Sequence, residues 1–332
     1  MLTLRRSQVQ AGAGGRTPFQ SLRRFLRKEQ VAGYLFISPW IVGFLLFALY
    51  PLLSTIYNSF TDMQLFGDAD WVGFSNYQKL LFHDPIFVTA LGNMLIYVLA
   101  ATAIYIVGGL GLALLLQHKF PGSHLFRTIF YLPSLMVGVG IGSMFVQVFN
   151  SQNYGLLNEV LGIFHIPSVE WLANYDHPFM GLIALIIVTI WFTGGTMLIF
   201  IAGLKGISKT YYEAAKIDGA NAWQRFRSIT LPLLTPVILF NTVITLIGHL
   251  QVFETALIFA GGGSGSVGSI TSVLGYRNSL STFLTYLFQE AFIFHHFGFA
   301  SALAVVIFVV TLILTAIVLL IFQRFTYYES DR

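Results

Sequence analysis

Six long stretches without a single charged residue constrain the fold of this chain more than any other feature of its sequence. They cover residues 30–61, 85–118, 128–158, 177–204, 228–253 and 291–323, and each is at least 26 residues long. Because about 20 apolar residues cross the hydrocarbon core of a bilayer as a helix, each stretch is long enough to span a membrane. We therefore predict an all-α integral membrane protein with six transmembrane helices. The predicted helices cover residues 34–60, 89–116, 128–149, 179–204, 237–260 and 300–322.

The composition supports this class and excludes several others. Hydrophobic side chains make up 56% of the 332 residues and charged ones 10%, and the mean hydropathy is +0.74. One water-soluble core could not bury that much apolar surface, which excludes an ordinary cytosolic enzyme. The absence of cysteine excludes disulfides and thiolate metal sites. A net charge of +4 is too small to indicate a nucleic-acid partner.

The positive charges lie almost entirely on one side of the predicted membrane. Of the 18 Lys and Arg residues, only Lys79 and Arg277 fall in loops on the other side. Since cytoplasmic segments carry the excess of Lys and Arg, both termini are predicted to be cytoplasmic. The predicted divisions are a basic cytoplasmic N-terminal segment at residues 1–33, a six-helix transmembrane domain at 34–325 and a cytoplasmic tail at 326–332.

All three outer loops show signs of local order, and the second, residues 150–178, has no Lys or Arg. The first contains a small aromatic cluster between Trp71 and Tyr77. The third contains residues 282–294, which are moderately apolar but too few to cross the membrane. We expect a surface or partly re-entrant helix there.

The cytoplasmic loop at residues 207–232 carries the clearest local signals. Thr210 and Glu213 have the spacing of a capping box, which starts a helix. Gly219 stands where a residue in the left-handed conformation ends one. The loop is therefore predicted to form a two-turn helix, a glycine turn and a second short helix capped by Asn221.

The first of these two helices is too short to be stable alone in water. Its residues Ala214 and Ala215, together with Gly219, present a low-relief face that another protein could approach closely. From the pattern alone, two interpretations stay open: a docking element for a partner protein, and an ordinary amphipathic connector.

At these residues the sequence resembles a known family, the permease subunits of bacterial ATP-binding-cassette (ABC) importers, through their EAA motif. The matching positions are Glu213, Ala214, Ala215, Gly219, Ile229, Leu231 and Pro232. Asp218 and the flanking residues are similar to the carbohydrate branch of that family, the maltose-type permeases. The resemblance extends over about residues 30–325.

This resemblance implies a type I ABC importer permease fold in the bacterial inner membrane. The implied partners are a second permease subunit, two cytoplasmic ATPase subunits, an extracytoplasmic solute-binding protein and a carbohydrate. The implied coupling residues are Glu213, Ala214, Ala215, Asp218 and Gly219. Because the chain has no Gly-Lys dipeptide and hence no Walker A loop, we expect it to bind no cofactor, with ATP and Mg²⁺ held by the ATPases.

Polar groups inside the predicted spans mark the expected pathway, because each must find a partner or face water. The fifth span is the richest in them. It carries Asn241, Thr245 and His249 on one helical stripe, and Gln251 and Glu254 on another. A helix with polar groups on two sides is expected to lie inside the bundle.

The resemblance places the family's substrate contacts at about residues 249–253 of this span. We predict that three side chains bind sugar hydroxyls and that Phe253 stacks on sugar C–H faces. The three are Asn241, His249 and Gln251. For each of them, a hydrogen bond to another helix stays open as an alternative.

The remaining pathway candidates carry less weight. For the carboxylate of Glu254, contact with a sugar hydroxyl and contact with water at the outer mouth both stay open. Further candidates are Asn93, Tyr97, Gln147, Asn150, Trp191 and Thr193. We expect no metal at His295 and His296, since neighbours on a helix point apart, and the sequence shows no catalytic motif.

The predicted function is the non-catalytic translocation subunit of an ATP-driven carbohydrate importer. The alternatives are a membrane enzyme and an ion- or proton-coupled secondary transporter acting alone, for which Glu254, His249 and His295 would be the coupling groups. No Lys or Arg lies inside a predicted span, which favours a neutral oligosaccharide. Fragments of an acidic polysaccharide stay open, because a partner subunit could supply the charge.

Overall fold

The computed structural model describes residues 29–118, 120–136, 138–150, 155–172, 176–177, 179–262 and 273–323. Within these ranges the regular structure is helical, with two isolated β-bridges and no strand. The predicted N-terminal segment lies outside the described residues up to position 28, and the predicted C-terminal tail lies wholly outside them. The chain forms two compact units, Met1–Thr55 and Ile56–Arg332.

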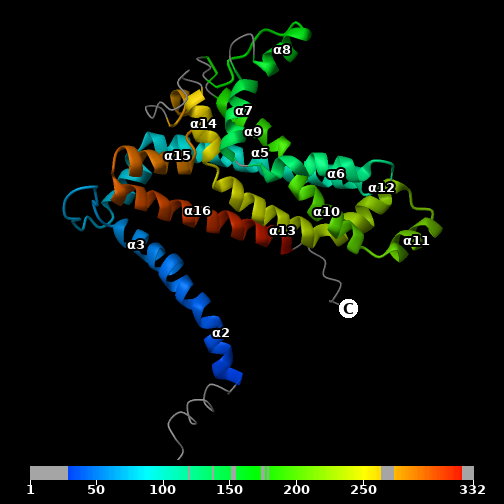
Figure 1. The fold of residues 1–332 in the computed structure, drawn as a ribbon, viewed down its shortest axis with the longest axis horizontal. Helices are drawn as coiled ribbons and strands as arrows, with labels where there is room; N and C mark the ends of the chain where they lie inside the picture. The colour runs from blue at the N-terminus through cyan, green and yellow to red at the C-terminus, as the bar shows by residue number, and fades with distance from the viewer. Residues whose placement is uncertain are drawn as a thin grey trace, which may run out of the picture. The chain divides into compact units, whose positions relative to one another are not determined.

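The described part of the first unit is a continuous apolar helix, blue in Figure 1. It consists of α2 (Glu29–Phe44), the π-helical turn η1 (Leu45–Leu49) and the first residues of α3 (Tyr50–Asn58). The stretch Gly33–Asn58 is long and apolar enough to cross a membrane, and its most apolar window has no residue buried inside the chain. A helix that is apolar on all sides needs lipid or other helices around it.

Three long helices of the second unit can also cross a membrane. They are α5 (Pro85–Leu116), the continuous stretch Ala222–Leu250 and α16 (Phe297–Gln323). The middle one is built from α12 (Ala222–Arg225), the π-helical turn η4 (Phe226–Thr230) and α13 (Leu231–Leu250). The described residues thus contain four unbroken candidate spans.

Two further candidate spans are helix pairs that bend at a short break. In one, α6 (Ser123–Tyr131) and the 3₁₀ turn η3 (Leu132–Leu135) meet α7 (Gly138–Val148) at a bend of 101°. In the other, α9 (Met180–Trp191) meets α10 (Gly194–Gly206) at 43°. If each pair is one span, the total is the six predicted from the sequence.

Helix α5 lies at the centre of the second unit, with α9, α10 and α13 packed against it. Its residues Ala90, Met94 and Ala101 are fully buried in the main core. Near its other end, Gly109 lets α10 approach so closely that a Cβ atom there would lie 2.9 Å from Thr196. Helix α13 packs against both α5 and α16, as Figure 1 shows.

The fifth predicted span is not one continuous helix. The helix ends at Leu250, and after a short break α14 (Glu254–Gly262) begins and packs on α7. The prediction of one helix over 237–260 is therefore wrong. A run of apolar residues predicts burial in a core or in lipid. It does not predict where a helix breaks, because the helices on both sides of this break are apolar.

The third outer loop contains the expected short helix. It consists of α15 (Phe283–Phe288) and the π-helical turn η7 (Gln289–Ile293). Thr282 caps it in a capping box with Thr285. The helix packs on α5 and α16 with Phe283 buried, so it lies on the bundle and does not cross a membrane.

The first outer loop is also ordered around its aromatic residues. The Phe60 ring lies 5.4 Å from the Trp71 ring and 5.4 Å from the Tyr77 ring, centroid to centroid. Asn76 Nδ2 donates to the carbonyls of Ser59 and Thr61, at 2.9 and 2.8 Å. The remaining short helices of the described loops are α4 (Ser75–Gln78), η2 (Lys79–His83), α8 (Leu156–Ile163) and η6 (Tyr276–Asn278).

Candidate coupling segment and substrate pathway

The first helix of the predicted coupling loop is α11 (Lys209–Ile217), and its N-cap differs from the expected one. Ser208 has an extended backbone, and its Oγ accepts a hydrogen bond from the Thr210 amide at 3.3 Å. The predicted capping box of Thr210 and Glu213 is therefore wrong. Ser208 is an equally good cap two residues earlier, so the helix starts before Thr210 and includes it.

The end of α11 has the predicted glycine turn. Gly219 has a φ of +77°, in the left-handed region. Its amide donates to the Lys216 carbonyl at 3.1 Å, and the Ala220 amide donates to the Ala215 carbonyl at 2.8 Å. These two bonds form a Schellman motif, which satisfies the last carbonyls of the helix and turns the chain sharply.

The second short helix follows the turn directly, as predicted. Asn221 Oδ1 accepts from the Gln224 amide at 2.9 Å, and Gln224 Oε1 accepts from the Asn221 amide at 2.7 Å. From this capping box the helix continues without interruption into α13. The Tyr212 hydroxyl lies 2.9 Å from the Thr230 hydroxyl, which ties α11 to the same continuous helix.

The outer surface of α11 is uncovered by the described chain. None of its residues is buried. Glu213, Ala214 and Asp218 are exposed, and Ile217 is 87% exposed. This strip of α11 is therefore accessible in the described chain.

Among the predicted substrate contacts, His249 lies in a hollow of about 230 Å³. Its Nδ1 is 3.1 Å from the Thr102 hydroxyl. The rings of Tyr97 and Tyr105 lie edge-on to the imidazole, at centroid distances of 5.8 and 5.3 Å. The hollow is also lined by Leu185, Val188, Thr189, Phe192, Gly248, Val252 and Thr255.

Two residues of this group, Thr102 and Tyr105, escape the sequence analysis. Tyr97, Thr102 and Tyr105 stand on α5, more than 140 positions before His249. Polar residues at positions 97, 102 and 105 of an apolar helix share one face, and this spacing is a signal that could have found them.

Asn241 does not line this hollow. It is 2% exposed, and its Nδ2 donates to the carbonyl of Val237, one turn earlier in the same helix, at 2.9 Å. Its predicted grouping with His249 in one binding site is therefore not seen among the described residues that line the hollow.

Gln251, Phe253 and Glu254 mark the break between α13 and α14. The Gln251 side chain is exposed, and Glu254 is exposed at the first turn of α14. Phe253 packs on Phe288, with ring centroids 5.3 Å apart. The prediction that Gln251 and Glu254 share a helix with His249 is wrong, because the helix ends at Leu250.

The other pathway candidates lie in different surroundings. Gln147 is exposed on α7, and Trp191 lies edge-on to Phe145 beside an apolar hollow of about 760 Å³. The Asn150 carbonyl accepts from Asn158 at 3.1 Å. Asn93 is buried, and its Nδ2 lies 2.9 to 3.4 Å from the carbonyls of residues 278, 279 and 281. Asn93 therefore ties α5 to the third outer loop.

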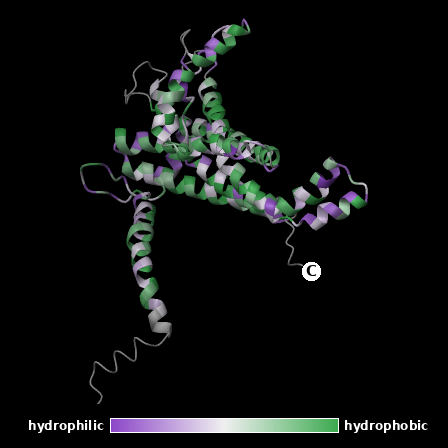
Figure 2. Cartoon of the chain, turned by 45° about the vertical axis from the view of Figure 1, so that its right-hand side comes forward, coloured by the Kyte–Doolittle hydropathy of each residue, from purple (hydrophilic) through white to green (hydrophobic). Residues whose placement is uncertain are grey.

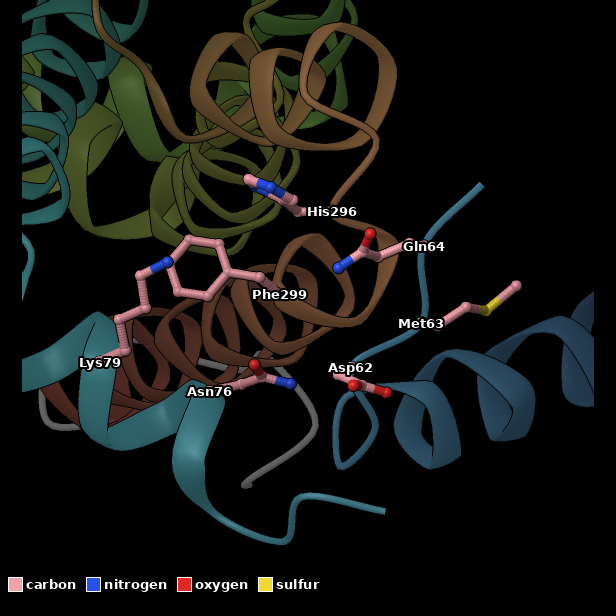
Figure 3. Close-up of a pocket in the computed structure, with 7 residues that line it drawn as sticks. All are labelled: Asp62, Met63, Gln64, Asn76, Lys79, His296 and Phe299. Carbon is pink, nitrogen blue, oxygen red and sulfur yellow. The ribbon is translucent and has the colours of Figure 1, made fainter. Parts of the chain in front are cut away.

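His295 and His296 do not share a helix. His295 has a φ of +59° in the short link before α16, and His296 Nδ1 lies 2.9 Å from the buried carboxylate of Glu290. His296 also lines a hollow of about 200 Å³, shown in Figure 3. There Lys79 lies over the Phe299 ring, with Nζ 4.7 Å from the ring centroid. The rest of the lining is Asp62, Met63, Gln64 and Asn76.

Residues 105–327, about two thirds of the chain, match the family of the binding-protein-dependent transport system inner membrane component. The chain therefore belongs to this family of multi-pass permease subunits of ABC transporters.

Individual relatives are similar in sequence along almost the whole chain. The YesP protein of Bacillus subtilis, described as a probable ABC transporter permease, is 37% identical over 92% of this chain and 95% of its own. The lactose transport permease LacF of Rhizobium radiobacter is 35% identical over 83% of this chain and 89% of its own. The arabinooligosaccharide permease AraP of Bacillus subtilis is 32% identical, covering 89% and 90%.

A solved structure confirms the predicted fold. A chain of a bacterial ABC transporter involved in importing the acidic polysaccharide alginate superposes with a TM-score of 0.75, over 92% of this chain and 100% of that one. Its sequence identity is 23%, so the likeness concerns the fold. The fold is that of a type I ABC importer permease.

Proposed function

We propose that this permease moves carbohydrate across a bacterial inner membrane, driven by ATP hydrolysis on two partner ATPase subunits. The substrate class rests on relatives at 31–35% identity, whose named substrates are arabinooligosaccharides, lactose, sulfoquinovosyl glycerol, and trehalose and maltose. In this proposal the chain is not itself an enzyme and binds neither ATP nor Mg²⁺. Both termini lie in the cytoplasm, as the distribution of Lys and Arg predicts.

The single observation that carries the coupling mechanism is the uncovered face of α11. We place this face, with Glu213, Ala214, Ala215, Asp218 and Gly219, in a groove of an ATPase subunit. The capping box at Asn221 and the Tyr212–Thr230 hydrogen bond join α11 to a membrane helix of 29 residues. Closure of the ATPase pair would therefore tilt that helix and favour an outward-open state, which ATP stabilises by binding it more tightly.

The proposed substrate path runs past the helix break and the hollow at His249. Irregular backbone among membrane helices is tolerated where it is buried in protein or lines a water-filled cavity, and broken helices mark many transport sites. Gln251 and Glu254 are exposed at this break, and the Thr102 hydroxyl and the rings of Tyr97 and Tyr105 contact His249 nearby. This set of neutral donors, acceptors and aromatic edges suits a neutral sugar.

The test uses the assembled transporter. The chain is produced with its second permease, its ATPase and its solute-binding protein, and the complex is placed in lipid nanodiscs. ATP hydrolysis is then measured with binding protein carrying neutral or acidic oligosaccharides. We expect neutral oligosaccharides to stimulate hydrolysis. Sugar uptake by this chain alone, abolished by a protonophore, would contradict the proposal and support a secondary transporter.

A further inference from the structure

A second hollow, of about 610 Å³, lies where the end of α5 meets α11, α12 and η4. Its volume is within the range of about 300–1,000 Å³ that is typical of small-molecule sites. Figure 2 shows hydrophilic residues gathered on the α11 and α12 hairpin, next to apolar membrane helices. The lining residues are Leu114, Gln117, His118, Tyr212, Lys216, Ala222, Trp223, Arg225, Phe226 and Thr230.

The charge on this lining is one-sided. Lys216 comes from α11 and Arg225 from α12, and no Asp or Glu is among the described residues that line the hollow. Arg225 is half-buried, and neither cation forms an ion pair with a carboxylate of the described chain. Gln117, His118 and the hydroxyl groups of the lining add neutral hydrogen-bond donors. Two cations converging on a cavity without a counter-ion favour an anionic ligand.

The hollow is separate from the proposed ATPase contact. Tyr212 and Lys216 are one helical turn apart, so they share the face of α11 that lines the hollow. Glu213, Ala214 and Ile217 do not line it. One face of the helix is thus available for a motor subunit while another is available for a ligand.

The hollow also lies at the level where a membrane helix ends. Leu114 lies in the last turn of α5 and Gln117 is the C-cap of that helix. Leu115, between them, is 71% exposed among apolar neighbours. Trp223 is 66% exposed beside the cations. Trp is enriched at the headgroup level, and basic pockets between membrane helices on the cytoplasmic side bind anionic headgroups.

We propose that this hollow binds the phosphate headgroup of an anionic phospholipid of the inner leaflet. Lys216 and Arg225 contact the phosphate, Tyr212 and Thr230 lie beside it, and the acyl chains run along the exposed apolar surface at Leu115. The proposal rests on the proposed orientation of the chain, and it is independent of the transported substrate.

The test counts retained lipid on the assembled complex. The complex is purified with phosphatidylglycerol and, separately, with phosphatidylcholine, and bound lipid is measured by native mass spectrometry. Each cation near an anionic headgroup contributes a factor of about five in affinity, so the Lys216→Gln/Arg225→Gln variant should hold phosphatidylglycerol about 25-fold more weakly. The matched control is Lys205→Gln/Arg227→Gln, which removes two basic residues of the same cytoplasmic segment that do not line the hollow.

Each outcome decides the question. The proposal is supported if the first variant loses phosphatidylglycerol, the control variant retains it, and the amount of bound phosphatidylcholine is the same in both variants. Equal retention in both variants overturns it, as does displacement of the lipid by inorganic phosphate at equal concentration. If the first variant instead releases the ATPase, the hollow is a protein contact and not a lipid site. Sugar-stimulated ATP hydrolysis, measured in parallel, reports separately on the proposed function.

Discussion

The coupling segment and the substrate pathway are built from contacts of very different range. The described hydrogen bonds of the cap and turn of α11 join residues at most five positions apart, and the Tyr212–Thr230 contact that tethers the helix spans 18 positions. The joints of the pathway region link residues far apart in sequence: Thr102 to His249, 147 positions apart, and Asn93 to Asn278, 185 positions apart. The first region owes its shape to local backbone chemistry, while the second depends on the packing of the whole bundle.

This difference teaches where a mutation should act. Local caps and turns can be broken without disturbing the bundle, so a change in α11 should uncouple transport while the permease stays folded. A change at a long-range joint removes an interaction between helices, so it should affect stability or substrate affinity.

The largest effect is expected at the turn that ends α11. Gly219→Pro fixes φ near −65° where the chain needs +77° and removes the amide that donates to Lys216, at a cost of about 3 kcal/mol. ATP-dependent uptake should be abolished while the permease pair still assembles. Gly219→Asn is the control, because Asn tolerates the left-handed conformation, and it should keep most of the uptake. Normal uptake with proline would show that the turn is not needed.

The next largest effect is expected at Asn93, whose hydrogen bonds join residues far apart in the sequence. Asn93→Ala removes the buried amide that meets three carbonyls of the third outer loop. We expect a loss of about 1–3 kcal/mol in stability, measured as a lower thermal midpoint of the purified complex. Gln147→Ala, at an exposed amide, should leave the midpoint unchanged. Equal midpoints for both variants would contradict a structural role for Asn93.

A smaller effect is expected in the hollow at His249. Thr102→Val removes the hydroxyl next to Nδ1 and should raise the KM for uptake about tenfold, equivalent to about 1.4 kcal/mol, without releasing the ATPase. Thr245→Val is matched to it, since the Thr245 hydroxyl donates to Asn241 in its own helix at 2.7 Å. A similar KM in the two variants would show that this hollow is not part of the substrate pathway.

The smallest effect distinguishes the observed cap of α11 from the one expected from the sequence. Ser208→Ala removes the side-chain oxygen that accepts from the Thr210 amide and should cost about 1 kcal/mol of helix stability. Coupled uptake should fall about fivefold. Thr210→Ala should change uptake less than twofold, because Thr210 lies inside the helix. A larger loss of uptake with Thr210→Ala than with Ser208→Ala would instead support the capping box of Thr210 and Glu213.

The sequence predicts those features that depend on length, charge and local spacing. The uncharged stretches predict the candidate spans, and Gly219 and Asn221 predict the turn and cap because each acts within a few residues of itself. Ser208 shows the limit of that approach, since two adequate caps stood two residues apart.

The remaining misses come from contacts that local pattern cannot see. The end of α13 at Leu250 lies within apolar sequence, so hydropathy alone runs through it. His249 is predicted from the sequence as a polar group in a span. Its contacts with Thr102 and Tyr105 could not be predicted, because they depend on how α5 packs on α13. Asn241 shows the opposite case, in which a polar group inside a helix is satisfied by its own backbone.

The helix at Gly33–Asn58 has a consequence for how cells handle this subunit. Its 26 residues carry no charged side chain, so contact with water along its length would be unfavourable. A copy made in excess of its partner subunits would have only lipid and its own helices to cover this segment. Matched synthesis of all subunits is therefore as much a condition for a durable transporter as the sequence of this one.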